Sequence, residues 1–543
     1  MRIRLRSSFL LSGAVFCAAV YLCSCNTLRQ PKSVPQPLNY SDEDIVANEI
    51  ERIDAFLEEE PVRALWRASL LGREEITQRC ISKVEELYNK AVEEEKYLDA
   101  RKYYKSILSV KPEWKASDYS YSQIENLAND KTPGFGKNNK APAKIADCMK
   151  AAVTVWVDRG VHVKNGSGYA DIIIGSGFFI DKRGYLITNH HVIDSMVDPK
   201  YEGYSRVFVK LPSDMETKIP AKVIGYDSVI DLALLKVEIE PECVFELGSS
   251  SDLGVGDKVS AIGTPIGLEG TLTSGIISAV DRKLTTMGSV LQLDAAVNSG
   301  NSGGPLIDEN KKVQAIVFAG MLQFQGLNFA IPVEYLKQEL PLLYKGGPVP
   351  HVWIGSYGHT KKVKAAKTGV EVQYVMPGGT AFFSGLKENC LITSLDNQKL
   401  ESLDQLQFYL MSKCDRTLVS VKYSDEEGAE KTVPLYLDVR PENPLLKIYE
   451  SDLLGNAFLP IFGMSLARSS TTNKKAYTVK SVLNGTSADE MGFSENDPVT
   501  VQDIKFDVDK NFFLAQLYVQ RRKKGFIDVS LTMGSYLDSP YYF

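Results

Sequence analysis

Residues 294–308 read DAAVNSGNSGGPLID, and this stretch places Ser302 in a glycine-rich loop just before an apolar strand. A serine hydroxyl is a poor nucleophile until an imidazole takes its proton, and that imidazole needs a carboxylate to fix its tautomer. Glycines beside the serine let backbone N–H groups turn toward a developing oxyanion. The stretch therefore predicts a catalytic nucleophile, whose histidine and acid must come from other segments.

The histidine has few candidates, because the chain holds only five histidines. Residues 177–194 (GFFIDKRGYLITNHHVID) place two of them, His190 and His191, at the end of a predicted strand. Adjacent residues of a strand point to opposite faces, so we expect only one of the two to enter the site. Residues 226–237 (YDSVIDLALLKV) place Asp231 at the head of an apolar strand. All three groups of a serine nucleophile site are thus present.

The blocks TNHHV, DLALL and GNSGGPL, in the order His, Asp, Ser, resemble the chymotrypsin-fold serine proteases and most closely their HtrA (Do-like) family. The resemblance covers residues 150–340. It implies His191 rather than His190 as general base, Asp231 as its orienting acid and Ser302 as nucleophile. It also implies an oxyanion hole formed by the backbone N–H groups of Gly300 and Ser302.

The segment GLNFAIPVEYL (326–336) resembles the family strand against which a substrate backbone pairs. The resemblance implies Asn328, Phe329 and Ala330 as the substrate strand. Residues 150–335 show short β-branched runs with period-two alternation, which predict an all-β barrel or sandwich. The family resemblance implies that this region is a chymotrypsin-like double barrel. We expect the trypsin-like protease domain at residues 143–345.

Two further segments resemble PDZ domains. WIGSYG (353–358) and GVEVQYVMPGGTAFFSGLKENCLI (369–392) resemble an HtrA-type PDZ domain, which we place at residues 346–440. The resemblance implies Trp353, Ile354 and Gly355 as the loop that binds peptide C-termini; alternatively, Trp353 is a core aromatic. Residues 441–543 repeat the order of elements faintly, which indicates a second, degenerate PDZ-like domain of α+β type.

The N-terminus is typical of a bacterial lipoprotein. MRIRLR (1–6) precedes an apolar run at 9–23, and LCSC (22–25) resembles a lipobox. This predicts a signal peptide at 1–25 and a lipid on Cys25; alternatively, an ordinary signal peptide is cut elsewhere. Residues 26–40 hold three prolines and read as a tether. Lipid would anchor the protein extracytoplasmically, in the periplasm.

Residues 41–130 carry apolar residues at helical spacing and predict an all-α module. Tyr97, Ala100, Tyr104, Ile107 and Pro112 fall where a tetratricopeptide (TPR) unit has its second helix and closing proline. One such unit is weak evidence, because stacking normally needs about three. A TPR-like interaction module and a plain helical spacer therefore both stay open.

The composition of the chain limits the classes of protein and of partner to consider. A chain of 543 residues with 44% hydrophobic and 24% charged residues predicts a multidomain globular protein. A net charge of −6 without a basic run argues against nucleic acid as a partner. The eight cysteines are too few for a disulfide scaffold, and they form no pair at metal-ligand spacing. We expect no cofactor and no metal.

The sequence predicts an HtrA-like serine endopeptidase that cleaves misfolded or exposed polypeptides for protein quality control. Its predicted partners are unfolded polypeptides, peptide C-termini at the PDZ domain and a membrane through the lipid. The family resemblance implies a homotrimer or larger assembly. The alternative from another class is a non-catalytic scaffold or chaperone that uses its PDZ and helical modules.

Overall fold

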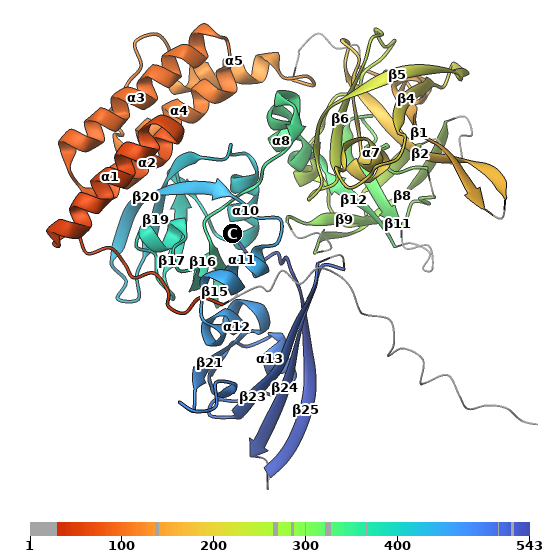
Figure 1. Cartoon of the computed structure of the whole chain (residues 1–543). Coiled ribbons are helices and arrows are strands. Elements are labelled where there is room, and N and C mark those ends of the chain that lie inside the picture. The colour runs from red at the N-terminus through yellow and green to blue at the C-terminus, as the bar shows by residue number, and fades with distance from the viewer. Residues whose placement is uncertain are drawn as a thin grey trace, which may run out of the picture.

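The computed structural model describes residues 30–135, 141–164, 166–263, 270–283, 287–298, 300–320, 327–364, 366–508, 510–522 and 526–543. Four groups of elements follow one another along the chain (Figure 1). The predicted signal peptide and Cys25 lie outside the described residues. Among the helices of these ranges, none is long and apolar enough to cross a membrane.

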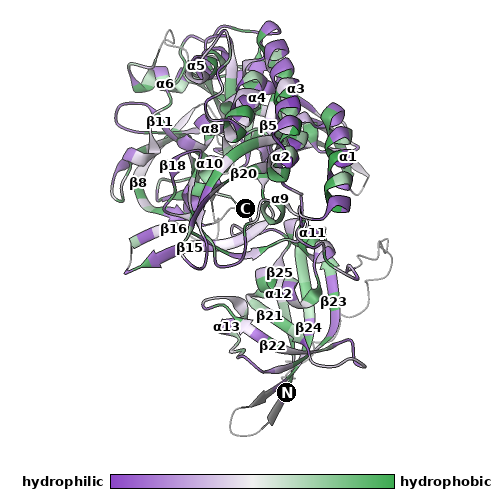
Figure 2. Ribbon diagram, turned by 90° about the vertical axis from the view of Figure 1, so that its left-hand side faces the viewer, coloured by the Kyte–Doolittle hydropathy of each residue, from purple (hydrophilic) through white to green (hydrophobic). Residues whose placement is uncertain are grey.

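The first group is a layer of five helices: α1 (Glu43–Glu59), α2 (Pro61–Leu71), α3 (Glu74–Glu93), α4 (Tyr97–Val110) and α5 (Tyr121–Lys131). Asp42 begins α1, because its side chain accepts hydrogen bonds from the N–H groups of Asp44 and Ile45. Green and purple bands alternate along α1 and α3 in Figure 2, as expected of helices buried on one face. The predicted helical region is confirmed, and the tetratricopeptide interpretation stays a prediction.

This helical layer packs on the sheet of the third group (Figure 1). Trp66 of α2 stacks on Tyr436 with ring centroids 5.6 Å apart, and its indole N–H donates to the hydroxyl of Ser384 (3.0 Å). Leu418 and Tyr436 share one buried cluster with the helices. The helical region is therefore an integral layer and not a separate extension.

The second group consists of two β-barrels. The first contains β1 (Ala152–Lys164), β2 (Ser167–Asp181), β3 (Tyr185–Thr188), β4 (Arg206–Leu211), β5 (Asp214–Asp227) and β6 (Leu232–Val237), and pairing of β5 with β6 closes it. The second contains β7 (Lys258–Gly263), β8 (Thr271–Arg282), β9 (Val290–Leu293), β10 (Pro305–Ile307), β11 (Val313–Gly320) and β12 (Asn328–Pro332), also closed. Two barrels in succession match the predicted double-barrel architecture.

Short helices flank the barrels: α6 (Ile145–Ala151), α7 (His190–Val197), the 3₁₀ turn η1 (Ser250–Asp252) and α8 (Val333–Lys345). After α8, β13 (Gly347–Pro348) pairs in parallel with the end of β5. The chain therefore leaves the protease region beside the first barrel.

The third group is a sheet in the order β14-β20-β19-β17-β16-β15. Its strands are β14 (Val352–Trp353), β15 (Ser356–Val363), β16 (Ala366–Val375), β17 (Leu391–Leu395), β18 (Gln398–Lys399), β19 (Thr417–Ser424) and β20 (Glu430–Val439), with helices α9 (Thr380–Phe383) and α10 (Leu403–Met411). β18 lies off this order and pairs with β17. The order itself places β15 at one end of the sheet.

The fourth group begins with α11 (Pro444–Ser451) and α12 (Leu454–Phe462). Its sheet contains β21 (Met464–Arg468), β22 (Ala476–Val482), β23 (Pro498–Asp507), β24 (Phe512–Arg522) and β25 (Phe526–Tyr536), with α13 (Ser487–Glu490) after β22. Both C-terminal groups thus combine sheets with short helices. Figure 2 shows the fourth group projecting below the other three.

Candidate active site

His191 lies in the first turn of α7, directly after β3. The expectation that His190 and His191 end a strand is wrong, because the helix begins at His190 itself. The two rings nevertheless diverge. His190 stacks on Tyr226 with centroids 5.3 Å apart, whereas His191 meets Asp231.

Asp231 holds His191 at two points. One carboxylate oxygen accepts the backbone N–H of His191 (2.8 Å), and the other lies 2.7 Å from the ring Nδ1. Asp231 has a φ of +61°, an uncommon conformation for a non-glycine residue, just before β6. The Asn189 side chain donates to its carbonyl (2.8 Å), and the side chain of Asp227 accepts the N–H of Val229 in the preceding turn (2.7 Å). Neighbouring groups therefore fix this acid in place.

The environment separates the basicities of the two histidines. Burial alone would lower the pKa of His191, but the hydrogen bond and negative charge of Asp231 outweigh it, and the net shift is upward. Burial lowers the pKa of His190. His191, whose side chain is 46% exposed, is therefore the more basic and the more accessible of the two.

Ser302 belongs to the second barrel, in the loop before β10. Its carbonyl accepts the N–H of Ser176 (2.8 Å), and the Ser176 hydroxyl donates to the Gly300 carbonyl (2.6 Å). A Cβ on Gly303 (φ +86°) would stand 2.2 Å from the carbonyl oxygen of Ser176, so only glycine fits there. The first barrel therefore holds the serine loop of the second, and the two barrels meet at this point.

The described contacts of the Ser302 hydroxyl point toward β11, where it donates to the Phe318 carbonyl (3.3 Å). Gly300 has a φ of +102°, which a side chain would disfavour. Ser299, the residue before Gly300, lies outside the described residues. The first barrel region thus contributes His191, from α7, and Asp231, and a loop of the second barrel contributes Gly300 and Ser302.

The assignment of Asn328, Phe329 and Ala330 as substrate strand is wrong. β12 pairs with β11 on one side and with β9 on the other, so its backbone has no free edge for a peptide. The Asn328 side chain is also buried and donates to the Ala295 carbonyl (2.8 Å). The strand that adjoins the serine is β11.

Trp353 and Ile354 are buried at the start of the third group, and Gly355 adopts a φ of +77°. Trp353 packs in the apolar cluster of the fourth group, as the core-aromatic alternative expected. The Ile354 carbonyl accepts the N–H of Ala381 (3.0 Å). This loop leads directly into β15.

Family comparisons agree with these features. Residues 175–316 match the trypsin-like peptidase domain, residues 445–537 the TP0546 family PDZ domain, and residues 44–128 a domain of unknown function. A probable periplasmic serine endoprotease, DegP-like, of Marinomonas sp. (strain MWYL1) is 31% identical over 344 residues, which cover 60% of this chain and 70% of the relative. The chain belongs to the HtrA family of serine proteases.

Other HtrA relatives are matched over shorter parts. The serine protease PepD of Mycobacterium tuberculosis is 33% identical over 48% of this chain and 60% of its own length. A DegP-like protein of Bartonella henselae is 36% identical over 51% of this chain and 55% of its own length. A solved structure, the HtrA-type protease AlgW with decapeptide, is 24% identical over 55% of this chain and 99% of its own chain, with a TM-score of 0.45.

Three buried ionisable side chains meet beside the turn that leads to Asp231 in this HtrA-family chain. Asp227 ends β5, Glu339 lies in α8 and His351 precedes β14; their possible ligand atoms lie within 4.8 Å of one another, a set that could hold a metal ion. Burial raises the pKa of Glu339 well above its ordinary value, and the charge of Asp227 adds to the rise. Burial would also raise the pKa of Asp227, but His351, whose Nε2 lies 2.8 Å away, helps to bring it down to about 2.

The sequence analysis missed this cluster, because its members come from three separate segments without a motif. Burial and the charge of Asp227 favour the protonated form of Glu339 by raising its pKa, and the Asp227 carboxylate lies 2.8 Å from the His351 ring. The cluster therefore ties the turn that leads to Asp231 to α8 and to the segment that leads to the third group.

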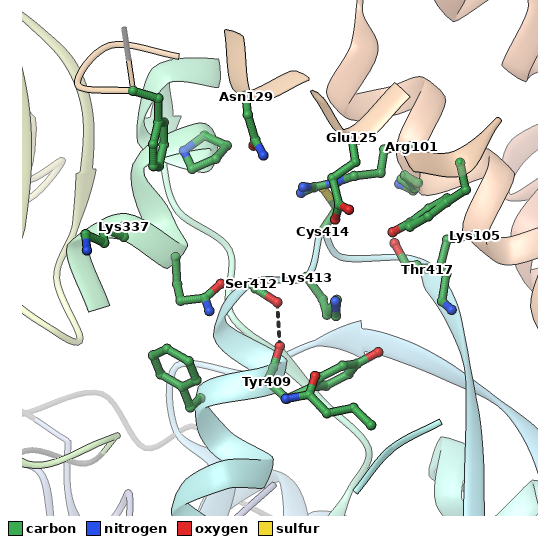
Figure 3. A pocket seen from close by; sticks show the side chains of 17 residues that line it. Arg101, Lys105, Glu125, Asn129, Lys337, Tyr409, Ser412, Lys413, Cys414 and Thr417 are labelled. Carbon is green, nitrogen blue, oxygen red and sulfur yellow. Dashed lines mark hydrogen bonds between the residues drawn. The ribbon is translucent and has the colours of Figure 1, made fainter. Parts of the chain in front are cut away.

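A basic cavity of about 330 Å³ lies where α4 and α5 meet α8 and α10 (Figure 3). Its cations are contributed by Arg101, Lys105, Lys337 and Lys413, among others, against one carboxylate of Glu125. Burial lowers the pKa of Lys413 to about 8. Residues from the helical layer, the protease region and the third group thus share one polar junction.

Proposed function

We propose that this protease is an extracytoplasmic endopeptidase that cleaves misfolded or exposed polypeptides, with Ser302, His191 and Asp231 as its triad. The observation that carries the proposal is the double contact of Asp231 with His191 in the first barrel, which also holds the Ser302 loop of the second barrel by hydrogen bonds. The names of the matched relatives, periplasmic serine endoproteases, support the compartment and the reaction.

In the proposed mechanism Ser302 attacks the scissile carbonyl while His191 takes its proton. Asp231 keeps the proton-bearing Nδ1 of the ring turned toward itself and stabilises the imidazolium that forms. The backbone N–H groups of Gly300 and Ser302 bind the oxyanion. His191 then gives its proton to the leaving amine, and water releases the acyl group from Ser302. General base catalysis contributes about 10²–10⁴ in rate, and an oxyanion donor about 10²–10³.

The substrate backbone pairs with the end of β11, residues 318–320, in this proposal. β12 covers only one edge of β11 there, and the Ser302 hydroxyl already reaches the Phe318 carbonyl. This replaces the β12 assignment and places the scissile bond within reach of the nucleophile.

The remaining parts are proposed to recruit and locate the enzyme. The PDZ domain of residues 346–440 binds peptide ends by strand addition, the helical region acts as a TPR-like or plain supporting layer, and the enzyme assembles as a trimer or larger. Cys25 carries the lipid. Mass spectrometry of the mature N-terminus tests the anchor: an unlipidated chain that starts elsewhere than at Cys25 refutes it.

Activity is tested with unfolded casein and a fluorophosphonate probe, each with and without added C-terminal peptides. Wild type should cleave casein and label at Ser302, and Ser302→Ala should do neither. Ser251→Ala, which changes an exposed serine of η1, is the matched control and should behave as wild type. Equal proteolysis by wild type and Ser302→Ala, or no labelling of Ser302 under any condition, ends the proposal.

A further inference from the structure

The last residues of the chain lie along the free edge of β15. β15 pairs with β16 on one side only. On its other side Ser356 and Phe543 exchange two backbone hydrogen bonds, each N–H donating to the other's carbonyl (2.9 Å), and the Gly358 N–H donates to the Tyr541 carbonyl (3.2 Å). Residues 541–543 therefore add one antiparallel strand to the PDZ sheet.

The side chain of Phe543 fills the space between β15 and α10. It is 1% exposed and belongs to the same buried cluster as Ile354 and Leu406. Gln407 of α10 donates to the Pro540 carbonyl. The segment is thus held by a strand on one side and by a helix on the other.

The preceding residue faces the opposite way, as alternation along a strand requires. Tyr542 is 1% exposed and packs in the cluster of Trp353 and Tyr357. Its hydroxyl donates to the Pro460 carbonyl (3.0 Å), and the Arg440 guanidinium donates to the Tyr542 carbonyl (2.8 Å). The segment therefore also fixes the fourth group against the third.

Backbone pairing at a sheet edge, with alternate side chains in pockets, is the mode by which peptides bind through strand addition. We propose that residues 539–543 (SPYYF) are an intramolecular ligand of the PDZ domain of residues 346–440, and that peptides with an aromatic Tyr-Tyr-Phe end compete with them for this groove. The proposal rests on peptide binding by this domain as part of the proposed function. A ligand on the same chain acts at a high effective concentration, so an outside peptide must displace it.

The test measures binding of a fluorescent DSPYYF peptide by anisotropy, in the Ser302→Ala background so that cleavage plays no part. If the segment fills the groove nine-tenths of the time, only about one-tenth of the molecules are open, and deleting residues 539–543 should strengthen apparent affinity about tenfold. A peptide with its final Phe changed to Asp should not bind, because that side chain would enter the apolar space of Phe543.

A milder variant covers the case in which the truncated chain fails to fold. Tyr541 is 41% exposed, and its ring lies 4.1 Å from that of His359, so Tyr541→Ala weakens the segment without opening a core cavity. An aromatic pair is worth a factor of about two to twelve, so at nine-tenths occupancy we expect peptide affinity to rise roughly two- to sixfold, less than on deletion. Tyr536→Ala, at an exposed tyrosine of β25, is the matched control and should change nothing.

Equal affinity for wild type, Tyr541→Ala and the truncated chain overturns the proposal, and so does absence of binding to both altered chains. Casein cleavage is read separately, in chains that keep Ser302. Loss of cleavage with intact peptide competition would refute the protease function alone, so the two failures are distinguishable.

Discussion

The buried cluster of Asp227, Glu339 and His351 gives the sharpest stability prediction. His351 is 6% exposed, and its ring lies 2.8 Å from the carboxylate of Asp227, which is 1% exposed. In His351→Ala this carboxylate loses its imidazole partner inside the protein. Removing one partner of a buried pair costs about 3–5 kcal/mol. We expect the lower end, about 3 kcal/mol, because Val229 and Ile230 still donate their N–H groups to Asp227.

Thermal unfolding in the Ser302→Ala background, where self-cleavage cannot interfere, measures this loss. For a domain of 150–250 residues each kcal/mol shifts Tm by about 2–4 °C, so the expected drop is about 6–12 °C. His162→Ala, at an exposed histidine of β1, is the matched control and should stay within about 0.5 kcal/mol of its parent. A Tm within about 2 °C of the parent for His351→Ala would show that the pair contributes little, and the argument would fail.

Three other outcomes follow from the site. Burial raises the pKa of Glu339, so the contribution of this side chain to the free energy of unfolding is full below its ordinary pKa and declines as pH rises through its pKa in the folded protein. Glu339→Gln should remove this decline, and its Tm should therefore fall less between pH 5 and pH 8 than the Tm of the parent. Asp231→Asn should lower kcat/KM about 10⁴-fold and move its acid limb to lower pH, because His191 loses the charge that raises its pKa; an unmoved limb contradicts this. Gly303→Ala should abolish fluorophosphonate labelling, since its Cβ would meet the Ser176 carbonyl; labelling at the parent rate contradicts this.

The sequence could nominate His191, Asp231 and Ser302 as a triad because each of them sits in a short local pattern. Thr-Asn-His-His, Asp-Leu-Ala-Leu-Leu and Gly-Asn-Ser-Gly-Gly each place one group at the end of a strand or in a tight loop. Alternation, a local property of strands, predicted an all-β barrel or sandwich, and the family resemblance implied the double barrel. The helical region followed in the same way from its apolar spacing.

Features that depend on pairing between distant segments were missed or misjudged. β12 looked like a substrate strand, but its second neighbour β9 lies more than thirty positions away and fills the edge. The meeting of Asp227, Glu339 and His351 has no sequence signal, because each residue serves a different element. The end strand at 541–543 is too short for any periodicity to show, and its partner edge on β15 is far earlier in the chain.

The turn that leads to Asp231 and the proposed peptide groove beside β15 are joined by a continuous set of contacts. The Arg440 side chain holds the Tyr542 carbonyl (2.8 Å), while its backbone N–H donates to the His351 carbonyl (2.8 Å). The His351 ring reaches Asp227, whose carboxylate orders the turn that ends at Asp231. A ligand can shift an equilibrium only by the difference between its contacts in the two states. An empty groove leaves Arg440 without its carbonyl partner, whereas an outside peptide with the same backbone restores it. The turn that leads to Asp231 should therefore change when the groove is emptied. It should not change when an outside peptide replaces residues 541–543.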